Sequence, residues 1–204
     1  MEFMDTIVFD LGGVLIDWNP AYLYRKIFQE EAQVQFFLTH ICDSHWNEQQ
    51  DAGRPLAEAT QILVAQFPEH TEAIQAYYGR WTEMLGGPIV GTVQLLEALH
   101  QQKKYRLYAL TNWSHETFPY ALKHYEFLQL FDGILVSGEE KLVKPDPRIY
   151  QLLFERFGIN PSTALFIDDN PKNVLASRQS GMEALQFVSP EQLQAALYDM
   201  GIHR

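Results

Sequence analysis

The residues Thr6-Ile7-Val8-Phe9-Asp10-Leu11-Gly12-Gly13-Val14-Leu15 decide how this chain folds. The run from Thr6 to Phe9 is rich in apolar β-formers, which is typical of a strand that is buried on both faces. Asp10 then stands at the carboxyl end of that strand, the edge at which open α/β sheets bind ligands. Gly12 and Gly13 let the backbone turn sharply and approach a ligand closely. Taken alone, this stretch fits both a ligand site and an ordinary strand end followed by a turn.

From Pro88 onward the sequence alternates between helix-forming and strand-forming segments. Strands are expected at residues 105–110, 133–136, 164–167 and 184–187, and helices around 93–99, 115–125, 147–157, 171–180 and 190–200. Strands that alternate with helices form parallel sheets through right-handed crossovers. The sequence therefore predicts an α/β fold with a Rossmann-like, doubly wound parallel sheet.

Residues 18–86 have a different character, because their apolar residues recur at helical spacing and no convincing strand is present. The last of these helices is expected to stop at Gly86-Gly87-Pro88. We therefore expect a helical cap domain at residues 18–86, inserted after the first strand of an α/β core domain that comprises residues 1–17 and 87–204. The two crossings between them, around Leu15–Trp18 and at Gly86-Gly87-Pro88, are expected to act as hinges.

Composition excludes several classes of function. The chain has 204 residues and a net charge of −11, whereas nucleic-acid and anionic membrane surfaces need a basic footprint. We therefore expect neither nucleic acid nor a membrane as a partner. Cys42 is the single cysteine, so a disulfide within the chain is impossible. Neither a secretory signal nor an apolar stretch of about 18 residues is visible, and a cytoplasmic protein is expected.

Polar residues follow the later strands at the points where those strands end. Thr111-Asn112, Lys144-Pro145 and Asp168-Asp169, with Asn173 one turn further on, all lie where they can converge with Asp10 on one sheet edge. Each motif taken singly is more often a helix cap, a turn or a solvated loop. It is their joint occurrence at strand ends that points to a site.

Three of these side chains, Asp10, Asp168 and Asp169, would bring three carboxylates together. Like charges at short range raise one another's pKa unless a cation compensates. A hard divalent cation with oxygen ligands, most simply Mg²⁺, resolves the repulsion and keeps waters for a substrate phosphate.

The remaining polar groups are suited to a phosphoryl group. Phosphate oxygens would be held by backbone amides near Leu11 and Gly12 and by the side chains of Thr111, Asn112 and Lys144. A carboxylate oxygen of Asp10 can attack phosphorus in line, which gives an aspartyl-phosphate. Lys144 would neutralise charge on the transferring group.

The motifs Asp10-Leu11-Gly12-Gly13-Val14, Thr111-Asn112, Lys144-Pro145 and Asp168-Asp169 occur in an order that resembles the haloacid dehalogenase superfamily, over residues 5–187. The helical insert resembles the cap of that superfamily's first subclass. The surroundings of Lys144 and Asp168 most resemble bacterial phosphatases that act on sugar phosphates, including glucose 1-phosphate.

The resemblance implies a role for each motif. Asp10 would be the nucleophile and a Mg²⁺ ligand, with the Gly12 carbonyl as another ligand. Asp168 and Asp169 would complete the metal site. The phosphoryl group would be bound by Thr111, Asn112 and Lys144.

One position departs from the family's pattern. Phosphatases of this superfamily usually carry an Asp two residues after the nucleophile, as general acid and base, and here Gly12 occupies that position. The 2-haloacid dehalogenases lack that Asp too. Three functions therefore stay open: a Mg²⁺-dependent phosphatase of a small phosphorylated metabolite, a 2-haloacid dehalogenase, and a non-catalytic phosphate-binding or phospho-acceptor module. The chain is expected to be a monomer or a weak homodimer.

Overall fold

The computed structural model describes residues 4–202. The outermost residues of the expected core domain, 1–3 and 203–204, lie outside the described part. Its central sheet is parallel and has the strand order β5-β4-β1-β6-β7. The strands are β1 (Thr6–Phe9), β4 (Arg106–Thr111), β5 (Gly133–Val136), β6 (Ala164–Asp168) and β7 (Glu183–Gln186). The predicted Rossmann-like α/β fold is confirmed.

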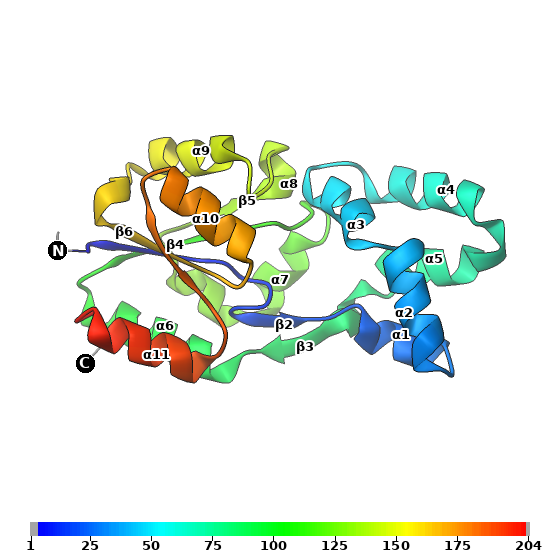
Figure 1. The fold of residues 1–204 in the computed structure, drawn as a ribbon, viewed down its shortest axis with the longest axis horizontal. Coiled ribbons are helices and arrows are strands. Elements are labelled where there is room, and N and C mark those ends of the chain that lie inside the picture. The colour runs from blue at the N-terminus through cyan, green and yellow to red at the C-terminus, as the bar shows by residue number, and fades with distance from the viewer. Residues whose placement is uncertain (1–3, 203–204) are drawn as a thin grey trace.

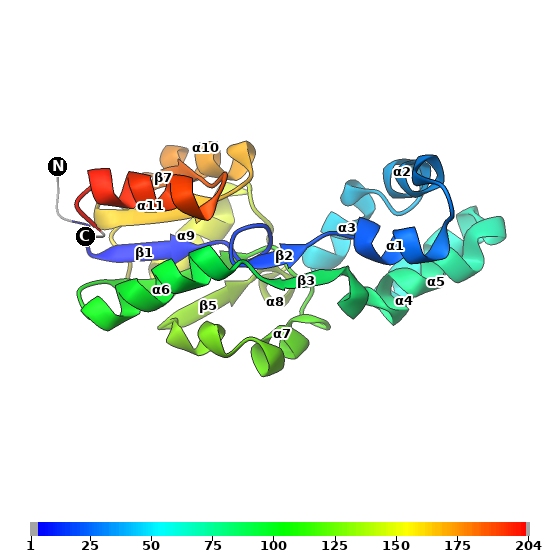
Figure 2. The same cartoon turned by 90° about the horizontal axis from the view of Figure 1, so that it is seen from below.

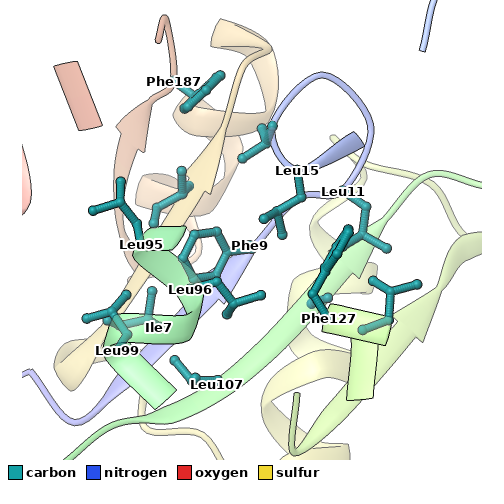
Figure 3. Packing of buried hydrophobic residues seen from close by; sticks show 14 of the residues in the cluster. Ile7, Phe9, Leu11, Leu15, Leu95, Leu96, Leu99, Leu107, Phe127 and Phe187 are labelled. Atoms are coloured by element: carbon teal, nitrogen blue, oxygen red, sulfur yellow. The ribbon is translucent and has the colours of Figure 1, made fainter. Parts of the chain in front are cut away.

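Strand β1 lies at the centre of the sheet and is buried along its whole length. Ile7 and Phe9 point into one hydrophobic cluster, whereas Val8 points into the cluster on the opposite face. Figure 3 shows Phe9 among Leu95, Leu96 and the other apolar residues of the first cluster. Complete burial of such a side chain stabilises the fold by about 1.5–3 kcal/mol.

Helices cover both faces of the sheet (Figures 1 and 2). Residues of α6 (Val90–Gln102), α7 (Phe118–His124) and α11 (Pro190–Asp199) join the cluster around Phe9. On the other face lie α9 (Pro147–Phe157) and α10 (Pro171–Gln179). The helix α8 (Ser137–Glu140) follows β5. Short 3-10 turns stand at Pro68–His70, Trp81–Met84, Glu126–Leu130 and Pro161–Thr163.

The helices between β1 and β4 that precede α6 form a second unit, drawn to the right of the sheet in Figures 1 and 2. They are α1 (Ala21–Ile27), α2 (Glu31–His40), α3 (Ser44–Asp51), α4 (Leu56–Gln66) and α5 (Thr71–Gly79). Their apolar faces share a separate core in which Tyr24, Phe37 and Ile74 are almost completely buried. We propose that this unit is the expected cap domain; its limits at residues 18 and 86 stay a prediction.

The expectation that residues 18–86 contain no strand was wrong at both ends. Strands β2 (Ile16–Trp18) and β3 (Leu85–Pro88) pair antiparallel and form the ribbon that connects the two units. Gly86-Gly87-Pro88 therefore lies in a strand, and α5 ends earlier, at Gly79. A two-stranded ribbon tolerates Pro88 because proline's missing N–H costs little at a sheet edge. Local periodicity does not reveal a pairing between segments so far apart in the chain.

Among the described residues, none of the helices is both long and apolar enough to cross a lipid bilayer.

Close approach within the ribbon predicts the effect of a methyl group at Gly86. A Cβ there would lie 2.1 Å from Asp17 Oδ2 and 3.1 Å from Asp17 Cβ. We expect Gly86→Ala to lower the free energy of unfolding by about 1–3 kcal/mol, the usual cost of overpacking. Urea unfolding followed by circular dichroism measures this.

The matched control is Gly79→Ala, because nothing lies within 4 Å of a Cβ at that helix-terminal position. We expect this variant to be neutral or to gain less than about 1 kcal/mol. Equal stability of the two variants would contradict the steric account of the ribbon.

Candidate active site

The carboxyl ends of the three central strands bring the predicted residues together. Asp10 directly follows β1, Thr111 ends β4 and Asp168 ends β6, and β1 lies between the other two strands. This edge faces the helical unit across a cavity of about 430 Å³. From the core, the lining includes Asp10, Gly12, Asn112, Lys144 and Asp169; from the helical unit it includes Asn47, Glu48, Asp51, Tyr77 and Tyr78.

Lys144 joins two of the carboxylates beneath the cavity. Its Nζ lies 2.9 Å from Asp10 Oδ1 and 2.7 Å from Asp168 Oδ2, and the residue is 3% exposed. Burial acts to lower the pKa of Lys144, but attraction by Asp10 and Asp168 outweighs burial, so the pKa is raised. The side chain therefore stays an ammonium ion between the two acids.

Asp168 is completely buried and held by the start of α10. Its Oδ1 accepts hydrogen bonds from the Asn170 N–H at 2.8 Å and from Asn173 Nδ2 at 3.0 Å. Asn173 thus orients the carboxylate, a role that its spacing one turn after the acidic pair did not reveal. With Lys144 on Oδ2, Asp168 has a fixed position at the base of the site.

Asp10 is also buried, with 7% of its surface exposed. Burial raises the pKa of Asp10 well above its ordinary value, and repulsion from Asp168 and Asp169 adds to this, while Lys144 opposes it. The Leu11 N–H donates to Asp10 Oδ1 at 2.7 Å, on the same oxygen that faces Lys144. These two contacts fix the carboxylate and leave Oδ2 without a hydrogen bond from any described residue.

The backbone amide of Leu11 contacts Asp10. We expected this amide to hold a phosphate oxygen, and that contact stays a prediction; here the N–H donates to the Asp10 carboxylate. The Leu11 side chain is buried in the core cluster. Leu11 therefore orients Asp10, while Gly12 next to it lines the cavity.

The donors of Thr111 and Asn112 differ in what they contact. The Asn112 side chain accepts from the Lys144 N–H at 2.9 Å and donates to the Lys144 carbonyl at 3.0 Å. Its amide thereby fixes the backbone of Lys144, while the residue also lines the cavity and its expected contact with phosphate stays a prediction. Thr111 Oγ1 is buried without a hydrogen-bond partner among the described residues, and Thr111 does not line the cavity, so its expected contact with phosphate stays a prediction.

The acidic residues suit a divalent cation. Asp10, Asp168 and Asp169 each offer an oxygen within 4.8 Å of the other two. Lys144 neutralises one of the three negative charges, which leaves two uncompensated. Burial, followed by repulsion from Asp168, raises the pKa of Asp169 as well. Oxygen donors with this excess of negative charge fit Mg²⁺.

The two glycines after Asp10 are under different constraints. Gly13 has a φ of +75°, and a Cβ there would lie 2.6 Å from Asp169 Oδ2. Gly12 has no left-handed φ, and nothing lies within 4 Å of a Cβ added to it. The turn therefore requires glycine at position 13 but not at position 12.

Sequence reasoning missed the contribution of the helical unit to this cavity. Asn47 and Asp51 lie on α3, and both line the cavity opposite Asp10. No local signal could have found them, because polar residues on a short helix usually face solvent.

Removal of one charge from this site has a predictable effect on stability. The folded state binds the Asp10 proton more tightly than the unfolded state does, so stability falls as pH rises from the ordinary Asp range through the raised pKa. In EDTA, Asp10→Asn loses the buried pair with Lys144, so we test the pH trend: we expect its melting temperature relative to the parent to be higher at about pH 8 than at about pH 5. A relative melting temperature that does not rise with pH would contradict this picture of the site.

Comparison with known proteins agrees with the geometry. The sesquiterpene phosphatase astK of Aspergillus oryzae is 28% identical to this chain. The match covers 88% of this chain and 88% of astK. The phosphorylated carbohydrates phosphatase of Thermotoga maritima is 25% identical over 91% of this chain and 85% of its own. A HAD family enzyme of Bacteroides thetaiotaomicron, solved with magnesium and inorganic phosphate, has a similar fold; the TM-score is 0.66 and the identity 23%, over 91% of this chain and 95% of that one.

The model of the haloacid dehalogenase-like hydrolases matches residues 4–181, a span that contains the ends of β1, β4 and β6 and therefore the site. The chain belongs to the haloacid dehalogenase-like hydrolase family.

Proposed function

We propose that this hydrolase is a Mg²⁺-dependent phosphomonoesterase that works through a phosphorylated Asp10. The observation that carries the proposal is the charge arrangement at the base of the cavity. A buried ammonium lies between Asp10 and Asp168, and a third carboxylate, Asp169, lies beside them. The three carboxylates carry more negative charge than Lys144 balances, so the site needs a bound cation. That cation would also face the phosphoryl group of the substrate.

Asp10 is poised as the nucleophile, because Leu11 and Lys144 hold Oδ1 and leave Oδ2 for attack. The Oδ2 lone pair forms a bond to phosphorus as the bond to the leaving-group oxygen breaks, and water later cleaves the acyl phosphate. Lys144 faces the attacking carboxylate and balances charge on the transferring group. Asp10, Asp168, Asp169 and the Gly12 carbonyl would hold Mg²⁺, which when bound neutralises charge on phosphate oxygens.

The cavity has the size of a small-molecule site and carries polar groups on one wall. Its volume falls within the ordinary range of small-molecule sites, roughly 300–1,000 Å³. Amide, hydroxyl and carboxyl groups of Asn47, Tyr78 and Glu48 stand on the wall opposite Asp10. The relative from Thermotoga maritima, a phosphorylated carbohydrates phosphatase, supports the same substrate class. We therefore propose a sugar phosphate, such as glucose 1-phosphate, as the substrate.

The same charges argue against dehalogenation. Displacement of halide occurs at a neutral carbon and needs no divalent cation. A dehalogenase would therefore not need Asp169 as a metal ligand. Without a cation, the uncompensated negative charge also repels the carboxylate of a 2-haloacid. A non-catalytic phospho-acceptor module would bind or take up phosphate without turnover, which separates it from both enzymes.

The activity test uses purified protein and a set of sugar phosphates. We expect hydrolysis with Mg²⁺, none in EDTA, and none with Asp10→Asn, whose amide cannot attack phosphorus. The matched control is Asp17→Asn, because Asp17 accepts a hydrogen bond from Tyr22 and does not line the cavity. Halide release from a 2-haloacid in EDTA, without phosphate release in Mg²⁺, would contradict the proposal.

The metal role of Asp169 predicts a change in Mg²⁺ requirement. We expect Asp169→Asn to raise the Mg²⁺ concentration for half-maximal activity by at least about tenfold. Loss of a group that only hydrogen-bonds to a metal ligand already lowers metal affinity by about that factor. Glu48→Gln removes a charge from the same cavity and is the control for a purely electrostatic effect. Equal shifts in the two variants would argue against ligation by Asp169.

A further inference from the structure

The last residue of α3 and the first residue of α4 are each fixed to the core by a hydrogen bond. Ser137 Oγ donates to the Asp51 carbonyl at 2.6 Å, and the Leu56 N–H donates to Glu116 Oε1 at 2.8 Å. Ser137 follows β5 directly, so its position depends on the central sheet. The backbone of Asp51 is thereby fixed relative to Asp10, although the two residues belong to different units.

The Asp51 side chain is oriented as well. Asn47 Nδ2 donates to Asp51 Oδ2 at 3.1 Å, and Tyr78 donates to Asn47 Oδ1 at 3.0 Å. Gln50 Nε2 in turn donates to the Tyr78 hydroxyl at 3.0 Å. This chain of hydrogen bonds holds the carboxyl group at the wall of the cavity that faces Asp10, Gly12 and Lys144.

We infer that Asp51 is the general acid and base of the reaction, and that it supplies from the helical unit the function that Gly12 does not supply from the core. The inference rests on the proposed phosphatase function. A Cβ at position 12 would meet nothing within 4 Å, so the fold does not require glycine there. Asp17, the other acidic residue close after the first strand, does not line the cavity and is bonded to Tyr22.

The surroundings of Asp51 suit both halves of such a role. Burial raises the pKa of Asp51 to about 7, and repulsion by Glu48 adds to this, while the Ser114 backbone N–H and Lys144 lower it. The phenols of Tyr77 and Tyr78 face it from α5 and stay neutral, because burial raises the pKa of each. A carboxyl group with a pKa close to neutral donates and accepts protons efficiently at that pH.

The proton balance closes over one turnover. Protonated Asp51 gives its proton to the leaving-group oxygen as the phosphorus–oxygen bond breaks and Asp10 becomes phosphorylated. The Asp51 carboxylate then takes a proton from the water that attacks the acyl phosphate. Phosphate leaves, Asp10 regains its electron pair, and Asp51 is again protonated.

The experiment compares leaving groups in the full-length protein with Mg²⁺. An alkyl phosphate needs its leaving oxygen protonated, whereas a nitrophenyl phosphate does not. For Asp51→Asn we expect kcat/KM to fall by about 10²–10⁴-fold on the alkyl ester and by less than about tenfold on the aryl ester. Rapid mixing with the aryl ester should show a burst of nitrophenol, because the base for the second step is gone.

Two further variants exclude a merely structural effect. Ser44→Ala, on the same helix and in the same cavity, carries no charge that acts on Asp51 and should keep the parent's alkyl-to-aryl ratio. Adding Gly12→Asp to Asp51→Asn should restore activity on the alkyl ester, because Gly12 lines the cavity and a Cβ there would meet nothing within 4 Å.

The possible failures are distinguishable. A parent without activity on any phosphate ester would overturn the proposed function, and the role of Asp51 with it. An active parent with an unchanged ratio in Asp51→Asn, or an equal loss on both esters that Gly12→Asp does not rescue, would overturn only the role of Asp51.

Discussion

The ion pairs of Lys144 with Asp10 and Asp168 are the constraint on which the site depends. Loss of one partner from a buried pair costs about 3–5 kcal/mol, so these three side chains hold one another in place. Asn112 fixes the Lys144 backbone, and Asn173 fixes Asp168. The parallel sheet brings all of them to one edge, and this edge is where negative charge still exceeds positive charge.

The second constraint is the contact between the helical unit and the core. The β2–β3 ribbon connects the two units, and Ser137 and Glu116 hold the end of α3 and the start of α4. In this arrangement Asp51 stands across the cavity from Asp10. If the β2–β3 ribbon acts as the expected hinge, the helical unit opens only when the Ser137 and Glu116 hydrogen bonds break, and Asp51 then leaves the site with it. Opening of the cavity and loss of the acid would then be one event.

Much of the fold could be predicted because its signals are local. The run from Thr6 to Phe9 and the helix–strand alternation after Pro88 indicate the sheet, and strand ends locate Asp10, Thr111 and Asp168. The β2–β3 ribbon and the contacts of Leu11 and Asn112 could not be predicted, because each depends on a pairing across the chain. The same holds for Asp51, whose environment is formed by Glu48, Lys144 and the tyrosines of α5.

The central claim is that Asp10 becomes covalently phosphorylated during turnover. The most direct measurement is peptide mapping by mass spectrometry after the enzyme, mixed with Mg²⁺ and an aryl phosphate, is quenched in acid. The account predicts one phosphoryl group, on the peptide that contains Asp10 and on that residue, and none in Asp10→Asn. Rapid turnover with phosphate on another residue, or with oxygen from labelled water entering inorganic phosphate without any phosphorylated Asp10, would contradict it.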